Sequence, residues 1–226
     1  MTPVLEVIAC NLEDALEAEV GGAGRLEVID RFDLGGLTPS AELVEKIASS
    51  VSIPVRVMLR ESGGYSVSSN EEIRKLKSSA KRFEGIGVDG VVLGFLKANL
   101  VDLELTAAIL DSSPNTKATF HHAFEGTEDK MAAIETIKRV PQIDRILSHG
   151  GAGEWREKHE LVDRYARLAR PQIELIAGGG VDRDAIRLLR EFTGINEFHV
   201  GTSARINGKV DRARVRELVR ALGEGK

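Results

Sequence analysis

The stretch Lys117-Ala118-Thr119-Phe120-His121-His122-Ala123-Phe124-Glu125 gives the clearest indication of the fold. Pro114 and Asn115 precede it and Gly126 follows it, so we interpret it as a β-strand that runs into a loop. Alternation directs His121 to the face opposite the apolar side chains of the strand. A histidine at the carboxyl end of a strand lies where parallel α/β proteins build their sites. The stretch therefore predicts a parallel α/β fold with a polar site.

Seven further runs of this kind alternate with amphipathic helical patterns along the chain. The eight expected strands are Val4–Ala9, Arg25–Ile29, Val55–Leu59, Gly90–Leu93, Lys117–His121, Arg145–Ser148, Ile173–Ala177 and Glu197–Val200. Eight βα units of about 28 residues each predict a (β/α)8 barrel, or TIM barrel, whose usual length is about 250 residues. We therefore expect residues 1–226 to form a single, compact α/β barrel domain with short loops.

A weak internal repeat favours the barrel. Each odd-numbered strand is preceded by a proline, namely Pro3, Pro54, Pro114 and Pro171. Each even-numbered strand is entered through a residue that suits a tight turn, namely Gly24, Asp89, Asp144 and Asn196. A doubly wound open sheet is the alternative, but it does not predict four similar quarters.

Helix starts are recognisable between the strands. The expected ones are Thr38 with Pro39 at the first helical position, Ser69 with Glu72 in a capping box, Asp182 and Asp211.

The composition excludes several classes of partner. The chain has 226 residues, of which 42% are hydrophobic and 29% are charged, as in ordinary globular proteins. Its net charge of −4 and its lack of like-charge runs argue against binding to nucleic acid or to an anionic membrane. No apolar run approaches the roughly 20 residues that span a bilayer, and no signal peptide is recognisable. Cys10 is the only cysteine, which excludes an internal disulfide, and we expect a cytoplasmic protein.

Most charged residues of the expected strands occupy inward-facing positions of the barrel. The inward set is Glu6, Arg25, Glu27, Arg56, Met58, Arg60, Thr119, His121, Glu174, Glu197 and His199. Because an unpaired buried charge is costly, these groups must pair, bind a ligand or contact water. Near the amino ends of the strands we expect an internal ion-pair network without chemistry, formed by Arg25, Glu27, Arg56 and Glu197.

The inward residues nearest the carboxyl ends are the candidate catalytic residues. They are Glu27, Arg60, His121 and His199, with Glu6 one layer deeper. Carboxylates beside histidines suit acid–base work on a small anionic substrate, with His121 or a glutamate as general base and Arg60 as anion clamp. Glu27, His121 and His199 equally suit a borderline metal ion. The residues leave both hypotheses open.

Two glycine-containing loops are expected at the same end of the barrel. They are residues 177–182 after the seventh strand and residues 200–205 after the eighth. Barrels often bind phosphate between these loops through backbone N–H groups, although such loops also serve only as tight turns. The expected cofactor- or anion-binding residues are Arg25, Gly179, Gly180, Gly201 and Thr202.

Three residues are weaker candidates. His149 ends the sixth strand and either reaches the site or lines the loop. His122 faces the helices by alternation, although a position near the strand end lets it swing. Cys10 ends the first strand near the same mouth, where a lone cysteine is usually a small packing residue.

Several segments resemble the CutC family, whose name is linked to copper homeostasis. They follow in order over nearly the whole chain: Leu5–Val7, Gly21–Val28, Gly35–Ser40, Val57–Arg60, Asp89–Gly94, Thr119–Glu125, Arg145–Gly150, Ala177–Gly180 and Glu197–His199. The stretches Gly-Gly-Leu-Thr-Pro-Ser and Phe-His-x-Ala-Phe are the most specific. The resemblance implies a (β/α)8 barrel that is often oligomeric, with copper as the expected ligand and a homo-oligomer as the expected assembly.

The chain departs from the family pattern at positions that bear on chemistry. After the third strand the family has Arg-Pro-Arg-Gly-Gly-Asp-Phe, of which this chain keeps Arg60 and the two glycines. The family's Phe-His-Arg-Ala-Phe-Asp becomes Phe-His-His-Ala-Phe-Glu, with His122 and Glu125 at the changed positions. Cysteines common at the ends of the first two strands are replaced by apolar residues. The chain resembles a divergent member of the family.

The missing thiols bear on copper, because Cu(I) prefers thiolate and thioether ligands. Of the sulfur-bearing residues, at most Cys10 and Met58 could converge. Cu(II) or zinc remains chemically possible on Glu27, His121 and His199, with Cys10 as a further candidate ligand.

We therefore carry two main hypotheses. The first is a cytoplasmic copper-handling protein, as the resemblance implies. The second is an enzyme that acts on a small phosphorylated or carboxylated metabolite at the carboxyl end of the barrel, with a binding barrel without turnover as its variant.

Overall fold

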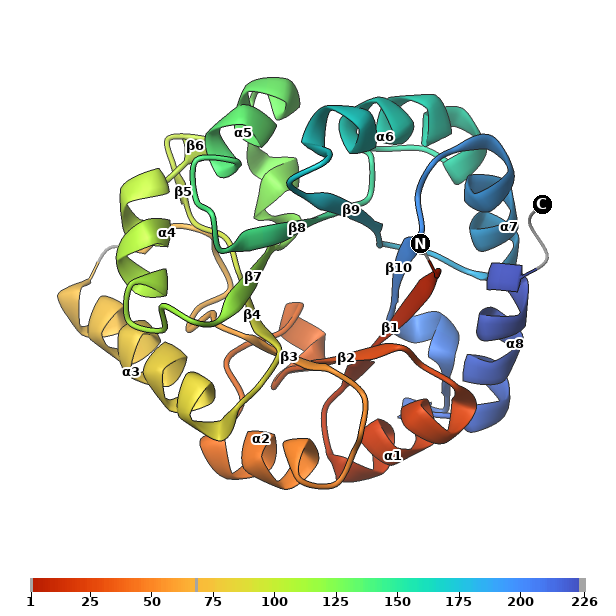
Figure 1. Ribbon diagram of the computed structural model, residues 1–226, viewed down its shortest axis with the longest axis horizontal. Helices are drawn as coiled ribbons and strands as arrows, with labels where there is room; N and C mark the ends of the chain where they lie inside the picture. Colours follow the sequence, from red (N-terminus) through yellow and green to blue (C-terminus); the bar gives the residue numbers. More distant parts are fainter. Residues whose placement is uncertain (1, 68, 224–226) are drawn as a thin grey trace.

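The computed structural model describes residues 2–67 and 69–223, and its centre is a closed barrel of eight parallel strands. Figure 1 looks along the barrel, whose strands lie inside a ring of helices. Around the barrel the strands follow one another in chain order, and the last pairs with the first. They are β1 (Val4–Ala9), β2 (Arg25–Val28), β3 (Val55–Met58), β4 (Gly90–Leu93), β7 (Lys117–Phe120), β8 (Ile143–Ser148), β9 (Glu174–Ala177) and β10 (Glu197–Val200).

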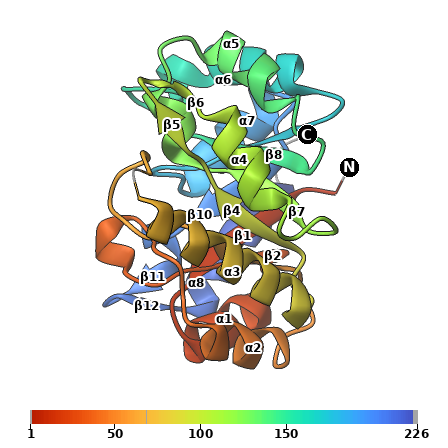
Figure 2. The same ribbon diagram turned by 90° about the vertical axis from the view of Figure 1, so that its left-hand side faces the viewer.

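The helices cover the outside of the barrel (Figures 1 and 2). They are α1 (Leu12–Gly21), α2 (Ala41–Ala48), α3 (Asn70–Ile86), α4 (Leu103–Leu110), α5 (Lys130–Ile137), α6 (Trp155–Ala169), α7 (Arg183–Phe192) and α8 (Arg212–Gly223). Three short 3-10 helices follow strand ends, namely η1 (Phe32–Leu34), η2 (His122–Gly126) and η3 (Thr202–Ala204). Two small hairpins that the sequence did not predict are β5 (Leu96–Lys97) with β6 (Leu100–Val101), and β11 (Arg205–Ile206) with β12 (Lys209–Val210). No helix in the described part of the chain is long and apolar enough to cross a membrane.

The predicted (β/α)8 barrel is confirmed, and each predicted strand agrees with the observed one to within one or two residues. The helix starts at Ser69, Asp182 and Asp211 are also confirmed, since each side chain accepts backbone N–H groups of the first turn. The start at Thr38 was wrong.

The N-cap of α2 is Ser40, whose hydroxyl accepts the N–H of Leu43 at 3.2 Å. Thr38 is instead tied to the end of β3. Its N–H donates to the carbonyl of Arg60 at 2.8 Å, and its Oγ1 accepts the N–H of Arg60 at 2.9 Å. Because these bonds tie Thr38 to the backbone of Arg60, the helix begins only after it.

The outward-facing strand residues form the core between barrel and helices. Leu5, Val7, Leu26, Phe120 and Phe198 are fully buried there, and they belong to one continuous apolar cluster. Burial of such side chains from water supplies the main driving force for the fold. The barrel interior is different, because it holds charged side chains.

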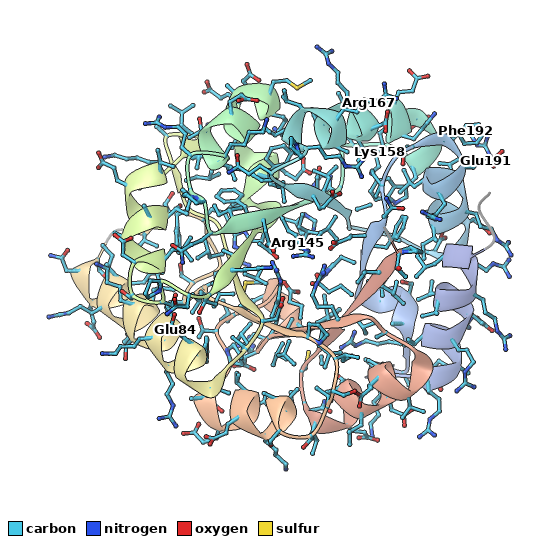
Figure 3. All side chains as sticks on the ribbon, viewed as in Figure 1. Glu84, Arg145, Lys158, Arg167, Glu191 and Phe192 are labelled. Atoms are coloured by element: carbon cyan, nitrogen blue, oxygen red, sulfur yellow. The ribbon has the colours of Figure 1, made fainter. Side chains whose placement is uncertain are left out.

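Arg25 is the centre of one interior ion-pair group. Its guanidinium donates to the carboxylate of Glu6 and, at 2.6 Å, to that of Glu197. Arg145 reaches the same Glu197 at 2.7 Å and also Asp144 at 2.5 Å. Figure 3 shows Arg145 pointing into the centre of the barrel. The charges therefore compensate one another within the barrel.

Arg56 extends this network to the next strands. It is completely buried and donates to Asp144 at 2.7 and 2.9 Å, to Asp89 at 3.0 Å and to Thr119 at 2.8 Å. Gly90 makes room for it, since a Cβ there would lie 3.2 Å from the guanidinium. The expected ion-pair network is thus present for Arg25, Arg56 and Glu197. Glu27 pairs with none of these residues; its side chain lines a cavity beside His199, 3.6 Å from Nε2 of that ring.

Candidate functional site

A cavity of about 530 Å³ lies at the carboxyl end of the barrel. Of the residues that the sequence nominated, those that line it are Glu27, Arg60, His121, His199, Gly179, Gly180, Gly201 and Thr202. The nominated residues that do not line it are Glu6, Arg25 and Cys10. Arg25 was nominated for anion binding, but its guanidinium is engaged in the interior ion pairs.

His199 is fixed between two carboxylates beside the cavity. Its Nδ1 lies 2.8 Å from Oε1 of Glu6, and its Nε2 lies 3.6 Å from Oε2 of Glu27. Burial opposes the charged ring, but Glu27 and Glu6 outweigh burial and raise the pKa of His199. Burial likewise opposes ionisation of Glu6, yet Arg25 and His199 hold the pKa of this carboxyl well below its usual range. Glu6 is therefore an ionised anchor for His199.

Glu27 is the carboxylate of this group that makes no hydrogen bond with His199. It is only 3% exposed, and it accepts no hydrogen bond from the described residues. Burial raises the pKa of Glu27 to about 7, an effect that His199 opposes and Glu6 reinforces. A buried carboxyl with this pKa can take up and release a proton near neutral pH, as a general base must.

His121 is held in one tautomer. Its Nδ1 accepts the backbone N–H of Ala123 at 3.2 Å, so in the neutral ring the proton is on Nε2. Burial, with Arg60 adding to it, lowers the pKa of His121 to about 3, which keeps the ring neutral. Its Nε2 is buried and has no hydrogen-bond partner among the described residues. Such an unsatisfied donor costs about 1–3 kcal/mol, and a ligand in the cavity would remove that cost.

Arg60 stabilises the loops around the cavity. Its guanidinium donates to the carbonyl oxygens of residues 34, 35 and 36 after β2 and of residues 63 and 64 after β3. It also stacks over the ring of Tyr65, 5.2 Å from the centroid. These contacts leave Arg60 little donor capacity for the anion-clamp role that we expected.

The glycine loops adopt the expected turns, but a carboxylate accompanies them. Gly179 and Gly180 have φ angles of 83° and 73°, the left-handed region that favours glycine. Asp182 also lines the cavity, and its Oδ1 accepts the N–H of Ala185 as the N-cap of α7. The positive end of α7 thus already faces a carboxylate. This arrangement disfavours a phosphate group between the loops.

Cys10 packs beside the cavity rather than in it. It packs against the small apolar cluster of Ile29, Met58 and Val92. Its Sγ lies 3.8 Å from Nη2 of Arg205, and burial raises the pKa of its thiol. A protonated thiol is a poor metal ligand.

The nominated ligands His121, His199, Glu27 and Cys10 do not form a converging group in the described part of the chain. His199 directs its two nitrogens at two different carboxylates, and Nδ1 of His121 is occupied by a backbone N–H. This geometry does not favour the ligand set that the sequence suggested.

Another set of residues does converge. His122, Glu125 and His149 bring one ligand atom each to within 4.8 Å of one another. His122 also lines the cavity, so the group lies at its rim. The rings of His122 and His149 are 5.5 Å apart between centroids. Among the residues 2–67 and 69–223, this is the group of three or more histidine, cysteine or acidic side chains that has metal-ligand spacing.

Strand alternation misjudged His122. Strand β7 ends at Phe120 and η2 begins at His122, so the two-residue period does not extend to this position. The 3-10 turn directs His122 and Glu125 towards the end of β8, where His149 follows the strand. The sequence feature that could have indicated this group is the departure from the family pattern at His122 and Glu125.

Fold and site together define a TIM-barrel protein with a cavity at the carboxyl ends of its strands that is lined by buried ionisable side chains. The chain belongs to the CutC family, whose model matches residues 3–204. It is similar to the human copper homeostasis protein cutC homolog, with 35% identity over 198 residues that cover 87% of this chain and 72% of the relative. It is also similar to a CutC family protein of Aliivibrio fischeri, with 33% identity that covers 91% of this chain and 84% of the relative.

Solved structures agree with the fold. The CutC protein from Streptococcus agalactiae superimposes with a TM-score of 0.83 at 27% identity, over 89% of this chain and 99% of that chain. Phosphoribosyl anthranilate isomerase from Thermotoga maritima superimposes with a TM-score of 0.64 at 16% identity, over 99% of both chains, and this likeness concerns the fold alone.

Proposed function

We propose that the protein binds one Cu(II) ion at His122, Glu125 and His149 and takes part in copper homeostasis in the cytoplasm. The observation that carries the proposal is the convergence of these three side chains at the rim of the cavity. Family membership supports copper as the metal, because relatives in this family are named copper homeostasis proteins.

The donor set suits Cu(II) rather than Cu(I). Two imidazoles and a carboxylate are ligands for borderline divalent ions, whereas Cu(I) selects sulfur. Among divalent first-row ions, such nitrogen and oxygen sites bind Cu(II) most tightly. The cluster contains no sulfur, and the thiol of Cys10 lies in a different group of side chains.

Glu125 is held in place for this role. Its Oε1 accepts the hydroxyl of Ser148 at 2.6 Å and the backbone N–H of His149 at 2.8 Å. Its Oε2 accepts no hydrogen bond from the described residues and is left for a ligand. Hydrogen bonds of this kind orient a coordinating carboxylate and typically contribute 10–100-fold to metal affinity.

His122 provides an independent observation. Its Nδ1 is buried and has no hydrogen-bond partner among the described residues. A buried imidazole nitrogen without a hydrogen bond destabilises the fold, and a metal ion bound to that nitrogen would remove this cost. His149 is partly exposed, so an ion has an entry path from solvent.

Calorimetric titration of the purified protein with Cu(II) tests the proposal. We expect saturation at one ion per chain, and at least about tenfold weaker binding in each of His122→Gln, Glu125→Gln and His149→Gln. His159→Gln is the matched control, because this histidine on α6 belongs to no converging group. The absence of saturable binding, or equal weakening by His159→Gln, contradicts the proposal.

A further inference from the structure

Two groups that line the cavity make no hydrogen bond among the described residues and are not explained by the copper site. One is the Nε2–H of His121, and the other is the carboxylate of Glu27, whose Oε2 has only an ion-pair contact of 3.6 Å with Nε2 of His199. Both side chains are almost completely buried, and both line the cavity. A donor and a proton acceptor that face one cavity indicate a ligand that uses both.

The fold holds His121 as a hydrogen-bond donor. The N–H of Ala123 occupies its Nδ1, which leaves Nε2 to donate. Gly94 makes space for the ring, because a Cβ there would lie 2.7 Å from Nδ1. Tyr65 packs on the ring with 5.3 Å between centroids. His121 is thus a fixed neutral donor of the kind that stabilises a developing negative charge on oxygen.

Glu27 is suited to accept a proton. It shares its surroundings with His199, Glu6 and Arg25, the charged groups that act on it. Glu6 and Arg25 are paired with each other, and His199 is hydrogen-bonded to Glu6 through Nδ1. Burial raises the pKa of Glu27 to about 7, so its basicity matches neutral pH.

Glu27 and His121 line the same cavity from two strands that are not neighbours in the barrel. Glu27 is on β2 and His121 follows β7, and β3 and β4 lie between these strands. A cavity of about 530 Å³ is of the size that holds a small molecule. A substrate between them would have a C–H bond towards Glu27 and an oxygen towards His121.

We propose that the cavity is a second functional site, which catalyses proton transfer at a carbon next to the carbonyl group of a small uncharged hydroxy-carbonyl compound. Glu27 takes the proton from the carbon, and the electrons of the C–H bond form a carbon–carbon double bond. The carbonyl electron pair moves to its oxygen, which accepts the hydrogen bond from Nε2 of His121. Protonated Glu27 then returns a proton to the carbon, so the step needs no oxidant, reductant or co-reactant.

The charges around the cavity favour an uncharged substrate. Arg60 is the only lysine or arginine among the described residues that line it, and its donors are engaged by loop carbonyls. Asp182 lines the cavity at the glycine loop. A phosphorylated compound would meet this carboxylate without a free cation to balance its charge.

Hydrogen–deuterium exchange followed by proton NMR tests the proposal. Hydroxyacetone and dihydroxyacetone in D₂O are the probes, and we expect the protein to accelerate exchange of their carbon-bound protons about tenfold or more over buffer. Glu27→Gln should reduce the acceleration about 100-fold or abolish it, and His121→Leu should reduce it more than His121→Gln, which keeps an N–H donor. His159→Gln should leave the exchange rate unchanged.

Two further measurements distinguish this proposal from the proposed copper site. The wild-type exchange rate should rise with pH around a midpoint near 7, and treatment with a chelator should leave it unchanged, because the copper site is not involved. Exchange no faster than in buffer with both probes overturns the proposal, as does equal exchange by Glu27→Gln protein that circular dichroism shows to be folded. Faster exchange with dihydroxyacetone phosphate overturns the assigned substrate class.

Discussion

The imidazoles of His122 and His149 lie 5.5 Å apart between ring centroids, although they come from different βα units of the barrel. Gly179 permits this approach, because a Cβ there would lie 2.7 Å from Cβ of His149 and 3.8 Å from Cε1 of His122. With Glu125, the pair forms the group of side chains to which we assign copper. The metal site that we propose therefore lies at the rim of the cavity that Glu27 and His121 line.

The hydroxyl of Ser148 should contribute to Cu(II) affinity without touching the ion. It donates to Oε1 of Glu125 at 2.6 Å and so orients the carboxylate. We expect Ser148→Ala to weaken Cu(II) binding about tenfold, and Ser148→Thr, which keeps the hydroxyl, to weaken it less. Calorimetry measures both affinities, and equal affinities in Ser148→Ala and wild type would remove this role.

Glu27→Gln should change how stability depends on pH. A solvent-exposed glutamate has a pKa of 4.5, whereas the pKa of Glu27 in the folded protein is about 7. Protonation of Glu27 therefore favours folding. This stability is fully present below about pH 4.5 and is lost as the pH rises towards 7; the difference is worth about 3 kcal/mol. His199 acts in the same direction, because its pKa is also raised in the folded protein.

We therefore expect wild type to lose about 2–3 kcal/mol of unfolding free energy relative to Glu27→Gln between about pH 5 and pH 8. Urea denaturation at both pH values measures this difference. A difference that stays constant with pH means that the pKa of Glu27 is not raised by folding.

Gly94→Ala should destabilise the protein by about 1–3 kcal/mol, because the new Cβ meets the ring of His121 in a closely packed site. Gly85→Ala is the matched control. It lies in α3, where a Cβ would meet nothing within 4 Å, so this change should stabilise by about 0.5–1 kcal/mol. Thermal denaturation compares the two variants. Tolerance of Gly94→Ala would show that His121 is not confined as described.

Sequence periodicity predicted the barrel because it is a property of whole strands. Alternation assigned Leu5 and Phe120 outward and Glu6 and Arg25 inward, as the structure has them. It could not assign His122, because the strand ends two residues earlier and a 3-10 turn follows.

Hydrogen-bond partners that depend on loop conformation also could not be predicted from the sequence. Arg60 could be predicted at the carboxyl end of a strand, but the five carbonyl oxygens around its guanidinium belong to two loops whose path no local pattern specifies. The clustering of Glu125 with His149 likewise depends on how η2 meets the end of β8.

Anomalous diffraction at the copper absorption edge, from crystals of the protein grown with equimolar Cu(II), tests the central claim most directly. The account predicts one anomalous peak within bonding distance of His122, Glu125 and His149, with nothing beside Cys10 and Met58. A peak at the sulfur atoms, a peak between Glu27 and His199, or no peak at all would contradict it.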